Sequence, residues 1–230
     1  MDETIEVVVV RVFTDERGWN GNELGILFAS PATAQREQAI ANALGFSETV
    51  VIDELDEAGR LAAVRIFTPA KELPFAGHPS VGTAWWLSDR HTPVDVLREK
   101  AGDVAVGVDD DLAWIEARAE WTPEFQWLPL ESPDDVEALD PFEFTEGQHY
   151  AYAWIDEEAG HLRSRMFSPA LGIIEDEATG AAAVAITAKL GRPLRITQGE
   201  GSEIVTELVG DGLIRVGGHT VYDRTIDATL

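Results

Sequence analysis

The chain has 230 residues and 45% of them are hydrophobic, which is enough to bury the core of one large or two smaller domains and excludes wholesale disorder. It contains no cysteine, and this excludes disulfides, thiolate metal sites and thiol nucleophiles. No apolar run approaches the ~20 residues of a membrane span, and the first residues, Met1-Asp2-Glu3-Thr4, are acidic where a secretory signal is basic. The sequence therefore predicts a soluble, cytoplasmic protein without a membrane partner.

The net charge is −25, from 42 acidic and 17 basic residues. Such a surface argues against a nucleic-acid partner, whose phosphates bind lysine and arginine. Charge of this size repels itself unless molar salt shortens the screening length to about 3 Å. We interpret it as adaptation to a salt-loaded cytoplasm, as in haloarchaea. The alternative is a merely acidic protein, and the charge specifies no function in either case.

Apolar and turn-rich segments alternate along the first half. A Val-rich strand is predicted at 5–13 and a turn-rich loop follows at 18–22. Ser30-Pro31 resembles the start of a helix, which is predicted to run to Leu44 and to end at Gly45. Further strands are predicted at 50–53, 60–68, 94–108 and 112–118, the last two joined by the acidic turn Asp109–Asp111.

After Arg118 the apolar pattern loosens, and 121–147 is rich in proline, glutamate and aspartate. We place an inter-domain connection at its start, which predicts one domain over 1–120 and a second over 121–230. A helix of small residues is predicted from Thr179 to Leu190, with Gly191 after it. Strands are predicted at 150–155 and 162–167, and a hairpin at 204–209 and 213–216.

An internal repeat links the two halves. Arg65-Ile-Phe-Thr-Pro-Ala70 recurs as Arg165-Met-Phe-Ser-Pro-Ala170, and each copy precedes a loop and a glycine-containing helix start, at Gly77 and at Gly180. Repetition of the same strand, loop and helix order predicts two similar halves that face each other across a cleft.

The two predicted helix starts define a candidate anion site. A helix N-terminus presents unpaired N–H groups and about half a positive charge, so two of them would bind a carboxylate without metal. Gly77 and Gly180 would let a ligand approach the backbone, although ordinary turn glycines are the alternative. His78 lies beside the first helix start, where it is either a cleft residue or a capping residue. Of the acidic residues 175–177 beside the second, one is expected to point inward.

Two long segments resemble motifs of the phenazine-biosynthesis PhzF family. Residues 65–84 resemble RIFTPxxELPFAGHPxxGTA, and residues 166–180 resemble MFAPxxGIxEDPATGSA. Shorter matches lie at Phe13-Thr-Asp with Gly21-Asn22, at Ser47-Glu48-Thr49 and at Val216-Gly-Gly218. The chain is identified as a member of this family over nearly its whole first half and its last third.

The resemblance implies an α/β fold of the diaminopimelate-epimerase type: two pseudo-symmetric domains, each a curved sheet or barrel around a central helix, with the active site between them. It implies an isomerase of a small carboxylate that needs no cofactor or metal and forms homodimers. Glu48 would be the general acid/base, and His78 and Asp176 the other catalytic residues. Substrate contacts would come from Asn22, Gly77, Thr179, Gly180 and Ala181.

Departures from the motifs leave alternatives open. Ala181 stands where the family has serine, Glu177 and Glu23 stand where it has proline, and the second domain is shortened. A non-catalytic small-molecule binder on the same scaffold is therefore an alternative. A divalent-metal hydrolase is another, although no HExxH-like spacing supports it. A two-thiol racemase is excluded because the chain has no cysteine.

Overall fold

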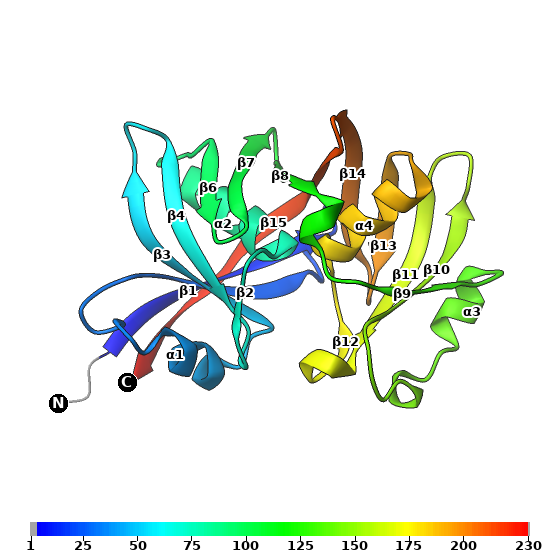
Figure 1. The fold of residues 1–230 in the computed structure, drawn as a ribbon, viewed down its shortest axis with the longest axis horizontal. Coiled ribbons are helices and arrows are strands. Elements are labelled where there is room, and N and C mark those ends of the chain that lie inside the picture. The colour runs from blue at the N-terminus through cyan, green and yellow to red at the C-terminus, as the bar shows by residue number, and fades with distance from the viewer. Residues whose placement is uncertain (1–3, 230) are drawn as a thin grey trace.

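The computed structural model describes residues 4–229, which form two halves that lie side by side (Figure 1). In the first half, eight strands are hydrogen-bonded in the order β1-β2-β3-β4-β6-β7-β8-β15, and β15 also pairs with β1, so the barrel is closed. These strands are β1 (Thr4–Thr14), β2 (Asn22–Phe28), β3 (Glu48–Asp56), β4 (Leu61–Phe67), β6 (Val96–Glu99), β7 (Gly102–Asp109), β8 (Leu112–Arg118) and β15 (Leu213–Thr229), and the short β5 (Glu72–Leu73) pairs with β4.

Helix α2 (Gly77–Asp89) runs through the middle of this barrel, and all its residues from Gly77 to Ala84 are buried. Small residues allow this central position. A Cβ atom at Gly82 would lie 2.6 Å from a methyl group of Val12, so glycine is needed where the helix crosses β1. The shorter α1 (Glu37–Leu44) lies outside, against a second apolar cluster that includes Ile40 and Phe67.

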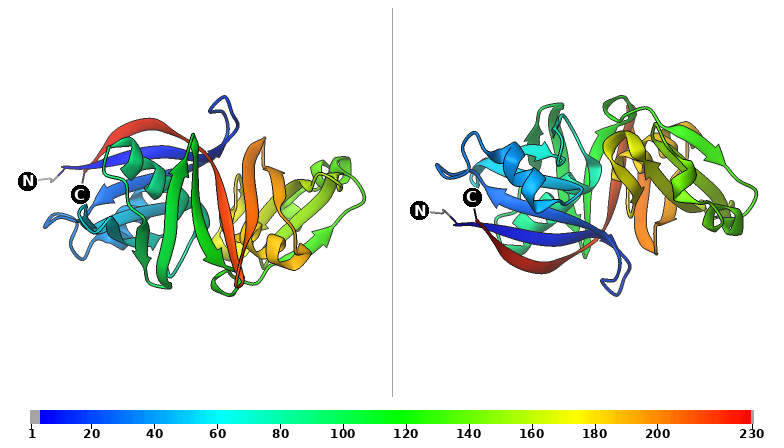
Figure 2. Two further views of the ribbon diagram at one scale, coloured as in Figure 1. Left: turned by 90° about the horizontal axis from the view of Figure 1, so that it is seen from above. Right: turned by 90° about the horizontal axis from the view of Figure 1, so that it is seen from below.

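The second half continues the sheet in the order β15-β14-β13-β11-β10-β9 and packs against α4 (Figure 2). Its elements are β9 (Gln126–Pro129), α3 (Pro133–Glu137), β10 (His149–Asp156), β11 (His161–Ser168), β12 (Ile173–Asp176), α4 (Gly180–Leu190), β13 (Leu194–Gln198) and β14 (Ser202–Gly210), with short 3-10 turns at Ala119–Trp121, Pro141–Glu143 and Pro169–Leu171. No helix within residues 4–229 is long and apolar enough to cross a membrane.

The predicted α/β class, with a curved sheet or barrel around a central helix, is confirmed. Two element predictions are wrong in detail. The helix predicted from Ser30 begins only at Glu37, because the Ser30 and Thr33 side chains bond each other's backbone and Gln35 takes a positive φ of 65°. The strand predicted over 94–108 is two strands, β6 and β7, separated by a turn at 100–101.

The closing hairpin is longer than predicted, because β15 continues to Thr229 instead of ending near 216. Residues 219–229 pair with β1 of the first half. The division into domains 1–120 and 121–230 stays a prediction. In the structure, β15 pairs with β14 of the second half up to Gly217, and its residues from His219 onward pair with β1 of the first half.

The charge leads to a first testable prediction. With a net charge of −25, the free energy of unfolding is expected to rise by a few kcal/mol between about 0.1 M and 2 M KCl, because salt screens the mutual repulsion of surface carboxylates. Urea denaturation at fixed pH and increasing KCl measures this change. A free energy that stays constant or falls would contradict adaptation to salt.

Candidate active site

The N-termini of α2 and α4 meet in the interior. A Cβ atom at Gly77 would lie 2.8 Å from the carbonyl carbon of Gly180 and 2.9 Å from the Ala181 nitrogen. A Cβ at Gly180 would lie 3.0 Å from the Gly77 Cα and from the His78 nitrogen. The two helix starts are therefore in backbone contact, and only glycine fits at both positions.

Neither helix start is capped by a side chain. Ala76 precedes α2 and has no hydrogen-bonding side chain, and Thr179 precedes α4 but makes no capping hydrogen bond. The first-turn N–H groups of both helices keep their capacity to bind a negative charge, and the two helix dipoles converge on the same place.

Glu48 is the first residue of β3, and its side chain is only 13% exposed. Parallel pairing with β2 sets Glu48 opposite Leu24. One of its carboxyl oxygens, Oε2, lies 3.5 Å from Nδ1 of His78, which is the second residue of α2 and 4% exposed. The other ring nitrogen of His78, Nε2, is buried and has no hydrogen-bond partner among the described residues.

Asp176 ends β12 and is held by two donors. Asn22 Nδ2 donates to its Oδ1 at 2.6 Å, and the Thr179 hydroxyl donates to its Oδ2 at 2.5 Å. Antiparallel pairing with Met166 of β11 fixes its position in the second half. Of the three acidic residues expected near this helix start, Asp176 points inward, whereas Glu175 pairs with Arg165 and Glu177 accepts hydrogen bonds from the Glu200 backbone and the Ser202 hydroxyl.

Two residues that sequence reasoning missed support this arrangement. The Ser47 hydroxyl donates to Asn22 Oδ1 at 3.1 Å, which orients the Asn22 amide toward Asp176. Gln198 is fully buried on β13 and donates to the Thr179 hydroxyl at 2.8 Å and to the Asp176 carbonyl at 2.9 Å. Asn22 and Thr179 were expected to contact substrate; the structure places both against Asp176, and a direct substrate contact stays a prediction.

A cavity of about 290 Å³ opens onto these groups. Its size is near the lower end for small-molecule sites, so it fits a single small molecule. Glu48, Asp176, Thr179 and Ala181 line one part of it, and the rest is mostly apolar. The apolar wall comes from both halves and includes Leu73, Phe75, Trp121, Phe125, Met166 and Ile173.

Burial sets the protonation states of this site. Desolvation, with a further contribution from the charge of Asp176, raises the pKa of Glu48 to about 8. Desolvation also raises the pKa of Asp176, but hydrogen bonds from Thr179 and Asn22 oppose this shift, so Asp176 is the better place for the negative charge. Burial lowers the pKa of His78 to about 3, and its imidazole is therefore neutral. Glu48 is thus a protonated acid that can lose its proton near neutral pH.

A third buried acid, Glu99, gives a testable prediction about pH. It lies on β6 outside this cavity, it accepts a hydrogen bond from Ser80, and burial raises its pKa to about 8. Between pH 4.5 and 8 the folded chain keeps a proton that the unfolded chain has released, so rising pH favours unfolding. The stability of the wild type relative to Glu99→Gln is expected to fall by on the order of 1 kcal/mol per pH unit over this range. Urea denaturation of both proteins from pH 5 to 8 measures it, and parallel curves would contradict it.

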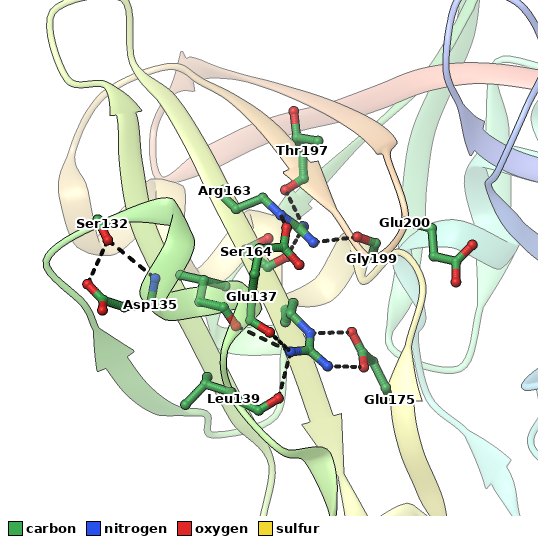
Figure 3. A network of polar contacts seen from close by, with 12 residues as sticks. Ser132, Asp135, Glu137, Leu139, Arg163, Ser164, Glu175, Thr197, Gly199 and Glu200 are labelled. Atoms are coloured by element: carbon green, nitrogen blue, oxygen red, sulfur yellow. Dashed lines mark hydrogen bonds and ion pairs between the residues drawn. The ribbon is translucent and has the colours of Figure 1, made fainter.

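A larger hollow, of about 640 Å³, lies on the opposite side of β11 and has a charged lining. Its arginines are already paired. Arg163 contacts Glu137 and the Gly199 carbonyl (Figure 3). Arg165 forms two hydrogen bonds with Glu175. The Arg165–Glu175 pair ties β11 to β12 next to Asp176. Within residues 4–229, no group of three or more His, Asp or Glu side chains is arranged to hold a metal ion.

Comparison with known proteins agrees with this architecture. The phenazine biosynthesis-like protein family (PhzC-PhzF) matches residues 10–140 and 119–217. Trans-2,3-dihydro-3-hydroxyanthranilate isomerase of Pseudomonas aeruginosa is 29% identical over 236 residues, which cover 86% of this chain and 84% of that protein. The protein of the same name from Pseudomonas chlororaphis is 32% identical over 224 residues, 80% of each chain.

Solved structures show the same fold. A PhzF-family phenazine biosynthesis protein from Bacillus anthracis superposes with a TM-score of 0.80 at 22% identity and covers 99% of this chain and 100% of its own. A hydroxyproline epimerase from Agrobacterium vitis, with a TM-score of 0.64 at 11% identity, covers 99% of this chain and 93% of its own. The fold, the family match and the relatives aligned over at least 80% of their length agree, and the chain belongs to the phenazine biosynthesis-like (PhzC-PhzF) family.

Proposed function

We propose that this chain is an isomerase that moves a proton between two atoms of a small carboxylate, without a cofactor, and that Glu48 is the general acid/base. The observation that carries the proposal is the position of Glu48. It lines a mostly apolar cavity together with Asp176, where the uncapped starts of α2 and α4 meet. The pKa of about 8 lets Glu48 accept a proton in one step and return it in the next.

The reaction needs two proton transfers. The Glu48 carboxylate removes a proton from a substrate carbon whose electron pair can delocalise onto the substrate's own carboxylate. The N–H groups of the two helix starts bind the negative charge that develops there, in a site that excludes most water. The Glu48 carboxylic acid then delivers the proton to a different atom of the substrate. Product and substrate have the same composition, so no other reactant is needed.

His78 and Asp176 are proposed to position the reacting groups. His78 is neutral and lies 3.5 Å from Glu48, so it can orient the Glu48 carboxyl group and a substrate group together. Asp176 keeps its negative charge through the hydrogen bonds from Asn22 and Thr179 and can accept a hydrogen bond from the substrate. Gly77, Gly180 and Ala181 contribute backbone N–H groups at the helix starts.

The names of the relatives supply a first compound to test. Trans-2,3-dihydro-3-hydroxyanthranilate is a single-ring carboxylate, and the cavity of about 290 Å³ is of the size that suits a molecule of this class. Ala181 carries no hydroxyl where the family motif has serine, and this difference supports a substrate other than that compound.

Proton NMR in D₂O with a panel of small carboxylates tests the proposal. An isomerase of this kind catalyses deuterium uptake into its substrate before or during conversion, and the uptake depends on Glu48. Saturable binding of a carboxylate with no uptake at any pH from 6 to 9 would identify a non-catalytic binder instead.

A further inference from the structure

Ser168 is a cavity residue with an unused hydroxyl. It is the last residue of β11 and is 1% exposed, and it lines the same cavity as Glu48 and Asp176. Its Oγ atom has no hydrogen-bond partner among the described residues. A serine hydroxyl can donate one hydrogen bond and accept two, and leaving it unpaired in the interior destabilises the protein.

The internal repeat shows that the fold does not require this hydroxyl. Thr68 is the equivalent residue of the first half, and its hydroxyl accepts hydrogen bonds from the Ala70 and Lys71 nitrogens and donates to the Lys71 carbonyl. Ser168 begins a turn in the same motif but makes no such bond. Thr68 thus holds its own turn together, whereas Ser168 is left free beside the cavity.

Strand geometry places Ser168 on the cavity side of β11. Met166 and Ser168, two residues apart, face the same side of the strand, and both line the cavity. Arg165 directly precedes Met166 in the chain, so its side chain points to the opposite side of the strand, where it pairs with Glu175.

The other two hydroxyl groups that line the cavity are already hydrogen-bonded within the protein. The Thr179 hydroxyl bonds Asp176 and Gln198, and the Thr122 hydroxyl donates to the Ala119 carbonyl. The family motif has alanine at the position of Ser168 and serine at the position of Ala181. This chain therefore carries the serine and the alanine at exchanged positions, and both positions line the cavity.

We propose that Ser168 is a specificity-determining residue whose hydroxyl binds a polar substituent of the substrate. The substrate class is a small carboxylate with a mostly apolar body and one hydroxyl or amino group apart from its carboxylate. The apolar body packs against the cavity wall, the helix starts bind the carboxylate, and Ser168 bonds the substituent. This inference rests on the proposed function and narrows its substrate.

Binding of non-reacting ring carboxylates tests this role. Isothermal titration calorimetry compares benzoate with 2-aminobenzoate and with 2-, 3- and 4-hydroxybenzoate. The wild type is expected to bind at least one substituted compound about tenfold more tightly than benzoate, since one hydrogen bond to a buried hydroxyl contributes that much. Ser168→Ala is expected to abolish this preference and to leave benzoate affinity within about twofold, while Ser168→Thr, which keeps the hydroxyl, retains part of it.

Thr220→Val is the matched control. Thr220 is also buried with an unpartnered hydroxyl, but it lies on β15 and does not line the cavity, so its substitution should leave the preference unchanged. A wild type without any preference, or a preference that survives Ser168→Ala, overturns the inference. Because this assay reads binding alone, its result is independent of Glu48-dependent deuterium uptake, and either proposal can fail without the other.

Discussion

Glu48→Gln is expected to lower deuterium uptake and isomerisation by at least about 10³-fold while it changes carboxylate affinity by less than about threefold. Glutamine has nearly the same shape as protonated glutamic acid, and the wild-type pKa of about 8 means that the protonated form already predominates at neutral pH. Substitution thus removes the ability to exchange a proton but preserves packing. Positioned acid/base groups contribute about 10²–10⁴-fold to rate, which sets the size of the effect. Single-turnover exchange in D₂O and calorimetric binding of the same compound measure the two quantities.

Glu99→Gln is the matched control for this experiment. Glu99 is also buried and its pKa is also about 8, but it contacts Ser80 of α2 and does not line the cavity. Its substitution should leave exchange within about threefold of the wild type. If Glu48→Gln exchanges normally, or if Glu99→Gln is equally inactive, Glu48 is not the base.

That the two helix starts face each other could be predicted from the sequence, whereas the direct contact of Gly77 with Gly180, in place of a gap for a ligand, could not. The repeat of Arg65–Ala70 at Arg165–Ala170 places a glycine-containing helix start after each copy, and this pattern led to the expectation that Gly77 and Gly180 face a shared cleft. The structure brings their backbones into contact. The position of the two helix starts could be predicted because so close an approach of two backbones requires glycine, and a glycine after each copy of a repeat can be recognised in the sequence.

Other residues of the site could not be identified from a sequence pattern of this kind. Glu48 is one of 42 acidic residues, and only the resemblance of Ser47-Glu48-Thr49 to a family motif singled it out. Gln198 joins the site from β13, far from Asp176 in the chain, and its polar character alone gives no sign that it is fully buried. Hydrogen bonds between distant segments depend on the completed fold, which local patterns do not encode.

Dependence on the completed fold also explains why β2 and the C-terminal part of β15 are not predicted from the sequence. β2 contains Gly25, which has little strand propensity, yet a Cβ there would meet the ring of Phe46 at 3.0 Å, so tertiary packing selects it. Residues 219–228 of β15 alternate little between apolar and polar and are mostly half-exposed. Their strand structure comes from backbone pairing with β1, which closes the barrel.

Gly77→Ala is expected to destabilise the chain by about 2 kcal/mol or more, although alanine is the better helix former by up to about 1 kcal/mol. The steric effect dominates because the new methyl group would lie 2.8 Å from backbone atoms of Gly180, and α4 can yield only by moving as a whole. Such a movement separates the two helix starts and shifts the anion site, and a displacement of about 1 Å at a reacting centre costs on the order of 10²-fold in rate. Urea denaturation and deuterium exchange measure the two losses.

Gly59→Ala distinguishes this contact from a general effect of replacing glycine. Gly59 lies in the exposed turn between β3 and β4, where a methyl group would meet only the carboxylate of Asp56. This side chain is exposed and can rotate away, although it gives up the hydrogen bond that it accepts from the Gly59 nitrogen. It should change stability by no more than about 0.5 kcal/mol and leave exchange unaltered. Both losses should appear together in Gly77→Ala, because one backbone contact joins the halves and also shapes the anion site. A destabilised variant that keeps full exchange would show that the helix starts do not bind the reacting anion.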